Sequence, residues 1–140
     1  MKIQLKRLNQ AVHFEAVNAS GNSVHFDGSP EIGGEDKGVR PMEGVLMSLA
    51  GCTAIDVVDM LKKMRQELAD LEIEVSAERR EEVPRIFTKI HLKYILSGEI
   101  EANKALRATQ MSAEKYCSVS KMLEPLVEIE HSVVLNGEAI

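Results

Sequence analysis

The residues of this chain best suited to chemistry are its two cysteines, Cys52 and Cys117. Two thiols held close together can form a sulfenic acid on one sulfur and resolve it with the other. Each thiol also has a structural interpretation, because cysteine is among the most buried residue types and often only packs on an apolar helix. Cys117 precedes "SVSKMLE", where the N-terminus of a short helix would lower the pKa of its thiol. The residue types alone leave both interpretations open.

Sequence motifs for other kinds of site are absent. The four histidines stand in different predicted strands, and there is no C-x-x-C, H-x-x-x-H or H-E-x-x-H motif, so no metal site is expected. The stretch "GGEDKGVRP" lacks the phosphate-binding pattern G-x-x-x-x-G-K-[ST], and no G-x-S-x-G marks a serine nucleophile. We therefore expect neither a metal nor a cofactor.

Length and composition narrow the class of protein. The 140 residues fit one domain, 1–140, of a size that often pairs with a second copy. With 17 basic and 22 acidic residues, three Phe, two Tyr and no Trp, the chain offers no basic groove or stacking platform for nucleic acid. No apolar run approaches the roughly 20 residues that a bilayer needs, and two cysteines are too few for a disulfide scaffold. A cytoplasmic location, away from membranes and nucleic acid, is expected.

The elements that must position the thiols follow from the apolar pattern. Alternation predicts three short antiparallel strands within residues 1–26, with a hairpin turn at 18–22. The glycine-rich segment 27–40 shows no period and predicts a long mobile loop. A helix is expected over 41–69, with a first half that is apolar nearly all round and should be buried on most sides. Cys52 belongs to that half.

The second part of the chain repeats the alternation. Two strands, 71–77 and 86–96, flank "RREEVPR", and a helix over 101–115 should bury Ala102, Leu106, Thr109 and Ala113. One or two helical turns follow Cys117, and a last strand spans 127–135 with His131 facing inward. The order βββ-α-ββ-αα-β is typical of the α+β class.

Two motifs resemble those of the OsmC/Ohr family. "RPMEGVLMSLAGCTAIDVV" is similar to the family's central helix, in which Asn-Pro, one or two acids and an apolar run precede a cysteine. "SAEKYCSVSKML" is similar to its second motif, Cys-Pro-Val-Ser, and "ERREE-PR-FT" points to the YhfA-like branch. The resemblance extends over essentially the whole chain. It implies an OsmC-like α+β fold with antiparallel sheets, a long central helix and a second cysteine-bearing helical segment, in an intertwined homodimer with two active sites at the subunit interface.

The resemblance also implies an activity. Members of the family are thiol peroxidases that reduce organic hydroperoxides; one thiol attacks the peroxide, and the other resolves the sulfenic acid. Cys52 matches the peroxidatic cysteine and Cys117 the resolving one. A small dithiol reductant, lipoyl in the best-known members, regenerates the pair.

Supporting residues match the family less closely. The family's catalytic glutamate directly follows the proline, where this chain has Met42, so that Glu43 is the nearest substitute, about 100° further around the helix. The thiolate-activating arginine has no counterpart at the matching place. Arg79 of "ERREE" is the candidate to replace it, with Arg40 and Arg80 as further candidates, although solvated or ion-paired surface charge is the commoner role for such residues.

Asp56 is the clearest departure from the peroxidase pattern. On a helix it lies one turn from Cys52 on the same face, where its carboxylate disfavours a neighbouring thiolate. This departure supports an alternative function. In that alternative the protein is non-peroxidatic and binds a small apolar or electrophilic ligand, with the cysteines as sensor or structural groups.

Overall fold

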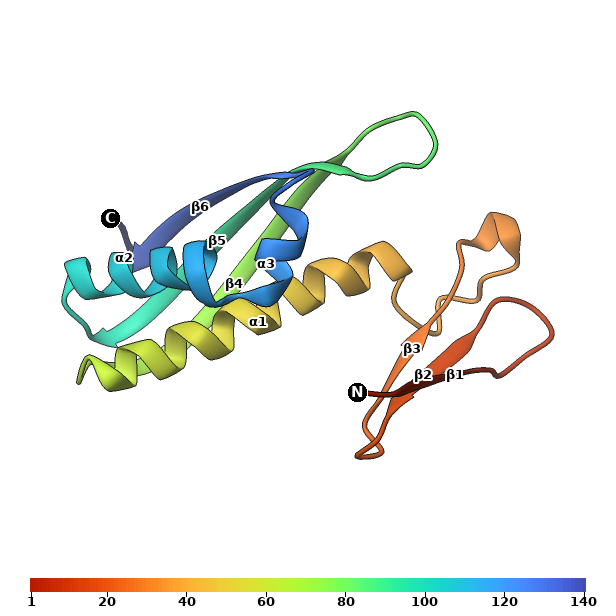
Figure 1. The fold of residues 1–140 in the computed structure, drawn as a ribbon, viewed down its shortest axis with the longest axis horizontal. Coiled ribbons are helices and arrows are strands. Elements are labelled where there is room, and N and C mark those ends of the chain that lie inside the picture. Colours follow the sequence, from red (N-terminus) through yellow and green to blue (C-terminus); the bar gives the residue numbers. More distant parts are fainter. The chain divides into compact units, whose positions relative to one another are not determined.

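The computed structural model describes residues 1–140 and divides into two compact units, Met1–Met47 and Ser48–Ile140 (Figure 1). Helix α1 begins in the first unit and continues into the second. In chain order the elements are β1 (Ile3–Arg7), β2 (Phe14–Asn18), β3 (Ser23–Phe26), a 3-10 turn (Pro30–Ile32), α1 (Pro41–Lys63), β4 (Glu67–Arg79), β5 (Phe87–Glu99), α2 (Ala102–Met111), a π-helical turn (Ser112–Tyr116), α3 (Ser118–Leu123), β6 (Glu128–Leu135) and β7 (Glu138–Ala139). The predicted α+β class is confirmed. That the whole chain is one domain stays a prediction.

The first unit is a three-stranded antiparallel sheet, as predicted, in the order β1-β2-β3. The segment 27–40 that follows is organised rather than irregular. The buried carboxylate of Asp27 accepts backbone hydrogen bonds from Gly28, Glu35 and Lys37 at 2.8, 2.9 and 3.0 Å. These bonds, the Lys37 N–H first among them, hold the pKa of Asp27 below its usual value.

The second unit is built on a four-stranded sheet in the order β4-β5-β6-β7. β4 and β5 form a long antiparallel hairpin, whereas β6 pairs with β5 in parallel, because α2 and α3 carry the chain back between them. Every second residue of β5 is buried on the face that α1 and α2 cover (Figure 1). These residues are Ile90, Leu92, Tyr94 and Leu96.

Helix α1 ends at Lys63, six residues before the predicted end, so the prediction over 41–69 is wrong at its C-terminus. Arg65 adopts a left-handed conformation with φ of 57°, and the N–H of Gln66 bonds to the carbonyl of Leu61 at 3.0 Å. This pattern is a Schellman motif, which closes a helix. Residues after it alternate as a strand, and Leu68 belongs to β4.

The first half of α1 is not buried on most sides within one chain. Leu49, Thr53 and Val57 are fully buried, but Ile55 is 72% exposed and Val58 is 45% exposed. The helix is also long and apolar enough to cross a membrane by length and composition alone, with a mean hydropathy of 1.6. A core helix of a soluble protein passes the same test, and one side of α1 lies in the core here.

The helix expected over 101–115 is broken. Regular α-helix ends at Met111, and a π-helical turn leads to Cys117. The buried face consists of Ala105, Ala108, Thr109, Ser112 and Ala113. Ala102 and Leu106 are exposed, so the predicted inner face was rotated from the observed one. Thr109 and Ala113 of the predicted face are buried, and the remaining buried residues are small ones that let the helix approach its neighbours closely.

Candidate functional site

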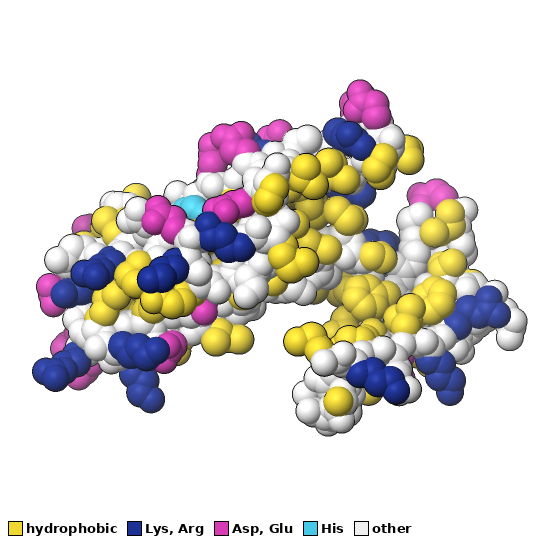
Figure 2. All heavy atoms as spheres, viewed as in Figure 1, with side chains coloured by type: hydrophobic (Ala, Val, Ile, Leu, Met, Phe, Trp, Pro, Cys, Tyr) yellow, Lys and Arg dark blue, Asp and Glu magenta, His cyan; other side chains and the backbone are white.

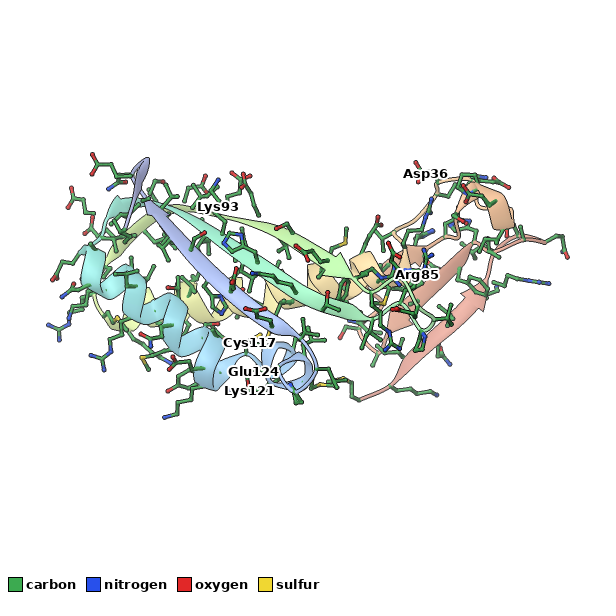
Figure 3. All side chains as sticks on the ribbon, turned by 90° about the horizontal axis from the view of Figure 1, so that it is seen from above. Asp36, Arg85, Lys93, Cys117, Lys121 and Glu124 are labelled. Carbon is green, nitrogen blue, oxygen red and sulfur yellow. The ribbon has the colours of Figure 1, made fainter.

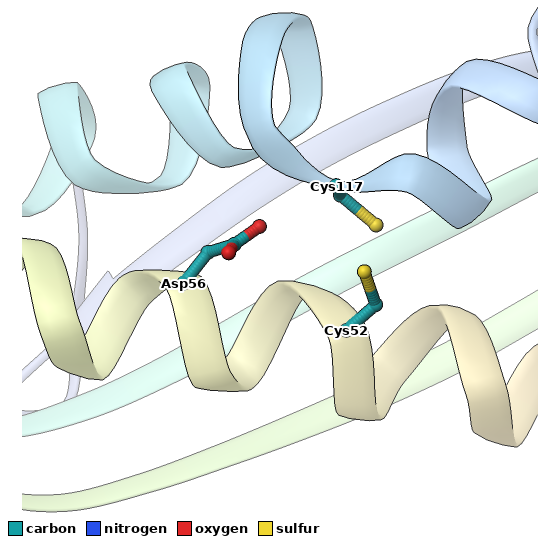
Figure 4. A group of neighbouring side chains, drawn as sticks. All are labelled: Cys52, Asp56 and Cys117. Carbon is teal, nitrogen blue, oxygen red and sulfur yellow. The ribbon is translucent and has the colours of Figure 1, made fainter. Parts of the chain in front are cut away.

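The two cysteines and Asp56 meet at one place in the second unit (Figure 4). Cys52 and Asp56 project from α1, and Cys117 projects toward them from the junction before α3. The two sulfurs and a carboxylate oxygen of Asp56 all lie within 4.8 Å of one another. Both cysteines are free thiols. The predicted pairing of Cys52 with Cys117 therefore has the proximity that it needs.

Helical spacing places the two groups of α1. Residues four apart lie on the same face, one turn from each other, so Cys52 and Asp56 point to the same side. The Ser112 hydroxyl donates a 3.0 Å hydrogen bond to the carboxylate of Asp56. This bond fixes the carboxylate from the opposite segment and ties α1 to the π-helical turn.

The π-helical turn places Cys117. Its N–H bonds to the Ser112 carbonyl at 2.9 Å, and the cysteine then adopts an extended conformation with ψ of 104°. Cys117 is thereby the N-cap of α3, and its sulfur accepts a 3.3 Å hydrogen bond from the N–H of Ser120. π-helical turns are rare and occur frequently at functional sites, since they redirect a side chain.

The helix start does not lower the pKa of Cys117 overall, contrary to the sequence expectation. Cys117 has no exposed surface, and burial raises the pKa of its thiol to about 11. The neighbouring Cys52 thiol raises this pKa further, and the N–H of Ser120 lowers it by less. At neutral pH Cys117 is a thiol rather than a thiolate.

Access differs between the two sulfurs. Cys52 and Asp56 are half-buried, whereas Cys117 is completely buried. A reactant from solvent therefore meets Cys52 first. A buried thiol behind an accessible one suits a pair in which one sulfur reacts and the other closes a disulfide.

Glu43 has a structural partner of its own in the first unit. Its exposed carboxylate accepts a 2.8 Å hydrogen bond from the backbone N–H of Arg40, three residues earlier. That bond satisfies a free N–H at the start of α1. A catalytic role for Glu43 stays a prediction.

Arg79 is engaged by the hairpin that carries it. Its Nε donates a 2.6 Å hydrogen bond to the Arg85 carbonyl, and its guanidinium lies 5.9 Å from the centre of the Phe87 ring. Figure 3 shows Arg85 at this hairpin, well apart from Cys117. A role at the thiols requires Arg79 to leave these contacts, and it too stays a prediction.

The sequence pattern does not indicate three further residues of the site. Ser112 and Ser120 flank Cys117 in "SAEKYCSVS", but nothing in that motif marks their hydrogen bonds to Asp56 and to the sulfur. Buried Tyr94 is the third; burial raises its pKa to about 12, against a smaller lowering by a hydrogen bond with Thr53. A tyrosine in a strand of alternating apolar residues ordinarily belongs to the core, so the residue type alone does not indicate a place beside the cysteines.

A separate cavity of about 490 Å³ opens between α2, α3 and β6. His131 lines it together with Glu114 and Glu124, and the imidazole lies with its ring centre 6.1 Å from that of Tyr94. Partial desolvation lowers the pKa of His131. Neither cysteine lines this cavity, so a ligand there does not touch the thiols directly.

Comparison with known proteins agrees with this architecture. Residues 34–132 match the family model described as OsmC-like protein. Protein YhfA of Escherichia coli K12 is 46% identical over 124 residues, covering 88% of this chain and 90% of that protein. The structure of a hypothetical protein from Aquifex aeolicus VF5 is 34% identical, with a TM-score of 0.80 over 96% of each chain.

More distant structures share the fold. One is an organic hydroperoxide resistance protein OsmC from Legionella pneumophila, 18% identical, with a TM-score of 0.71 over 95% of this chain and 96% of that one. The suspected resemblance, including its YhfA-like branch, is confirmed by the family match and by the identity to YhfA. The chain belongs to the family of OsmC-like proteins.

Proposed function

We propose that the protein is a thiol peroxidase that reduces organic hydroperoxides with Cys52 as nucleophile and Cys117 as resolving thiol. The observation that carries this proposal is the proximity of the two sulfurs, within 4.8 Å, with only Cys52 open to solvent. A disulfide needs a separation of about 2.05 Å, which side-chain rotation and small backbone shifts can supply. The name of the Legionella relative, organic hydroperoxide resistance protein, supports the substrate class.

The reaction proceeds in three balanced steps. The thiolate of Cys52 attacks the distal peroxide oxygen, the O–O bond breaks, and the alkoxide takes a proton and leaves as the alcohol. Cys117 then attacks the Cys52 sulfenic acid, its proton joins the departing hydroxide, and water leaves as the disulfide forms. A dithiol such as a lipoyl group reduces the disulfide and becomes oxidised itself.

Cys117 begins the second step as a thiol, because its pKa is raised to about 11. The attacking form of cysteine is the thiolate, so the Cys117 proton must pass to the departing oxygen as the S–S bond forms. The sulfenic oxygen then leaves as water. Glu43 and Arg79 remain in the proposal as supporting residues, each after leaving its present partner.

The proposal includes a homodimer located in the cytoplasm. Each unit leaves large apolar side chains open, and hydrophobic patches are visible in the space-filling view (Figure 2). A sheet with one apolar face is stabilised when that face packs against another element. The most exposed apolar residues of β1, β3 and α1 are Ile3, Leu5, Val24, Met47, Ile55 and Val58.

The alternative, a non-peroxidatic protein with sensor or structural thiols, is favoured by one observation. Asp56 lies beside both sulfurs, its hydrogen bond comes from a neutral hydroxyl, and no basic side chain forms an ion pair with it. Reactive thiolates ordinarily lie beside Lys, Arg or protonated His, and a carboxylate without such a partner is not that environment. In this alternative the thiols oxidise slowly and do not turn over.

Peroxide turnover distinguishes a thiol peroxidase from the non-peroxidatic alternative. Purified protein is mixed with tert-butyl hydroperoxide and dihydrolipoamide, and peroxide consumption is followed for the wild type, Cys52→Ser and Cys117→Ser. We expect the wild type to turn over many equivalents and Cys52→Ser to fall to the uncatalysed background. Cys117→Ser should turn over more slowly, because the dithiol must then reduce the sulfenic acid directly. Consumption unchanged by Cys52→Ser contradicts the proposal.

A further inference from the structure

The geometry points to a binding site for a thiophilic divalent cation, Zn²⁺ in particular, formed by Cys52, Asp56 and Cys117 in the reduced protein. Two sulfurs and one carboxylate oxygen lie within 4.8 Å of one another. Donors around a tetrahedral zinc, with Zn–S bonds of about 2.3 Å, lie about 3.8 Å apart. Closing the cluster onto a metal therefore requires shifts of about 1 Å or less.

The chemistry of the donors suits zinc. Thiolate ligands select zinc over magnesium or calcium, which prefer sets of oxygen ligands. Three protein ligands with an open fourth position are characteristic of zinc sites that keep a water or exchange a ligand. Asp56 and Cys52 are half-buried, so a hydrated cation can enter past them and leave Cys117 as the inner ligand.

Surrounding hydrogen bonds already orient the donors. Ser112 donates to the Asp56 carboxylate at 3.0 Å, and the Ser120 N–H donates to the Cys117 sulfur at 3.3 Å. Such outer partners fix ligand orientation in metal sites and survive when the metal binds, since each ligand atom keeps a further lone pair.

A bound Zn²⁺ also explains why a carboxylate lies beside two thiols. Asp56 repels a thiolate when the site holds only protons, but it adds to the attraction when Zn²⁺ lies between the three groups. Binding exchanges two thiol protons for one Zn²⁺, with no change of oxidation state. The inference depends only on the three donors and does not need the peroxidase activity. Metal and peroxide would compete for the same reduced pair.

No known metal-binding motif marks this site, because its ligands do not follow a familiar spacing. Two of them lie four apart on one helix as Cys-x-x-x-Asp, and the third comes from a distant junction. Zinc-finger and H-E-x-x-H patterns have no such arrangement.

The test is metal binding by the reduced, full-length protein without peroxide. Zn²⁺ is titrated against a chromophoric chelator under anaerobic conditions, and Co²⁺ is added separately as a spectroscopic probe. We expect one metal per chain, release of protons, and a sulfur-to-cobalt charge-transfer band with visible bands of four-coordinate intensity. Asp56→Asn should weaken Zn²⁺ affinity at least as much as the loss of an outer-shell partner does, which is about 10- to 100-fold. Cys52→Ser should abolish the charge transfer that arises from its sulfur.

Asp59→Asn is the matched control, since Asp59 is an exposed acid on the same helix, paired with Lys63. It should bind Zn²⁺ as tightly as the wild type. The inference is overturned when the reduced wild type releases all its Zn²⁺ to the chelator, or when Asp56→Asn binds as tightly as Asp59→Asn. Because both carboxylate variants change partly or fully exposed positions, they test the site even where Cys117→Ser does not fold. Failure of peroxide turnover leaves this result unaffected.

Discussion

Burial, rather than the helix start, decides the protonation of Cys117. The hydrogen bond from the Ser120 N–H and the N-terminus of the six-residue helix α3 favour the thiolate form of Cys117. Complete burial outweighs both, so the pKa of Cys117 rises to about 11. Tyr94 shows the same balance, with a pKa raised to about 12 by burial. The sequence pattern showed the helix start, but depth in the core comes from tertiary packing, which no local pattern contains.

Both shifts make the protein less stable in alkaline solution. The unfolded chain loses the Cys117 and Tyr94 protons near pH 9 and 10, whereas the folded chain keeps them until about pH 11 and 12. Stability from these groups is therefore fully present below pH 9 and is lost as the pH rises through 11 and 12. We expect the free energy of unfolding in urea to fall by roughly 3 kcal/mol per group across this range.

Cys117→Ala provides the control for that decline. It removes the thiol and should reduce the slope of the curve between about pH 9 and pH 11, whatever it does to stability at neutral pH. A curve of unchanged slope in this variant would show that Cys117 does not titrate as described.

At the scale of elements, the C-terminus of α1 could not be predicted from the sequence pattern. Apolar residues kept a helical period through Leu68, so the pattern extended the helix past its true end at Lys63. Arg65 is not glycine, yet it takes the left-handed position of a Schellman motif with φ of 57°. That conformation is unfavourable for a residue with a Cβ, and the hydrogen bonds from the Arg65 and Gln66 N–H groups to Lys62 and Leu61 offset part of the cost.

Arg65→Gly should therefore stabilise the protein. We expect an increase in the free energy of unfolding of up to about 1 kcal/mol, because glycine adopts this conformation without strain. Urea unfolding at neutral pH measures it, and Arg65→Ala, which keeps a Cβ, should show no comparable gain. Equal stability of the two variants would contradict a strained helix end.

The short strands, by contrast, were predictable from the sequence. β1, β2 and β3 pair in antiparallel order because alternation along each strand already sets one apolar face. The π-helical turn was not predictable, since "SAEKY" carries good helix formers and the extra residue per turn appears only in the packed structure. That turn is what brings Cys117 to Cys52.

At the scale of the whole molecule, a single chain leaves apolar side chains of α1 exposed. The first half of α1 has the composition of a core helix, but Met47, Ile55 and Val58 are exposed. Large exposed apolar patches are typical of interaction sites. The proposed homodimer would cover these residues and so account for the apolar sequence of the helix.

Light scattering coupled to size exclusion tests that assembly. We expect a mass of about twice the 15.5 kDa chain at micromolar concentration. Ile55→Glu places a charge on the exposed face of α1 and should shift the protein toward monomer, whereas Asp59→Asn on the same helix should not. A wild type that elutes as a monomer contradicts the proposed homodimer.

A single-turnover oxidation tests the cysteine pair most directly. The reduced protein is mixed with one equivalent of tert-butyl hydroperoxide, and intact and peptide masses are measured. The proposed mechanism predicts the loss of two hydrogens per chain and a Cys52–Cys117 linked peptide, with a sulfenic acid trapped on Cys52 in the Cys117→Ser variant. Two thiols left free after the peroxide is added, or oxidation confined to Cys117, would contradict it.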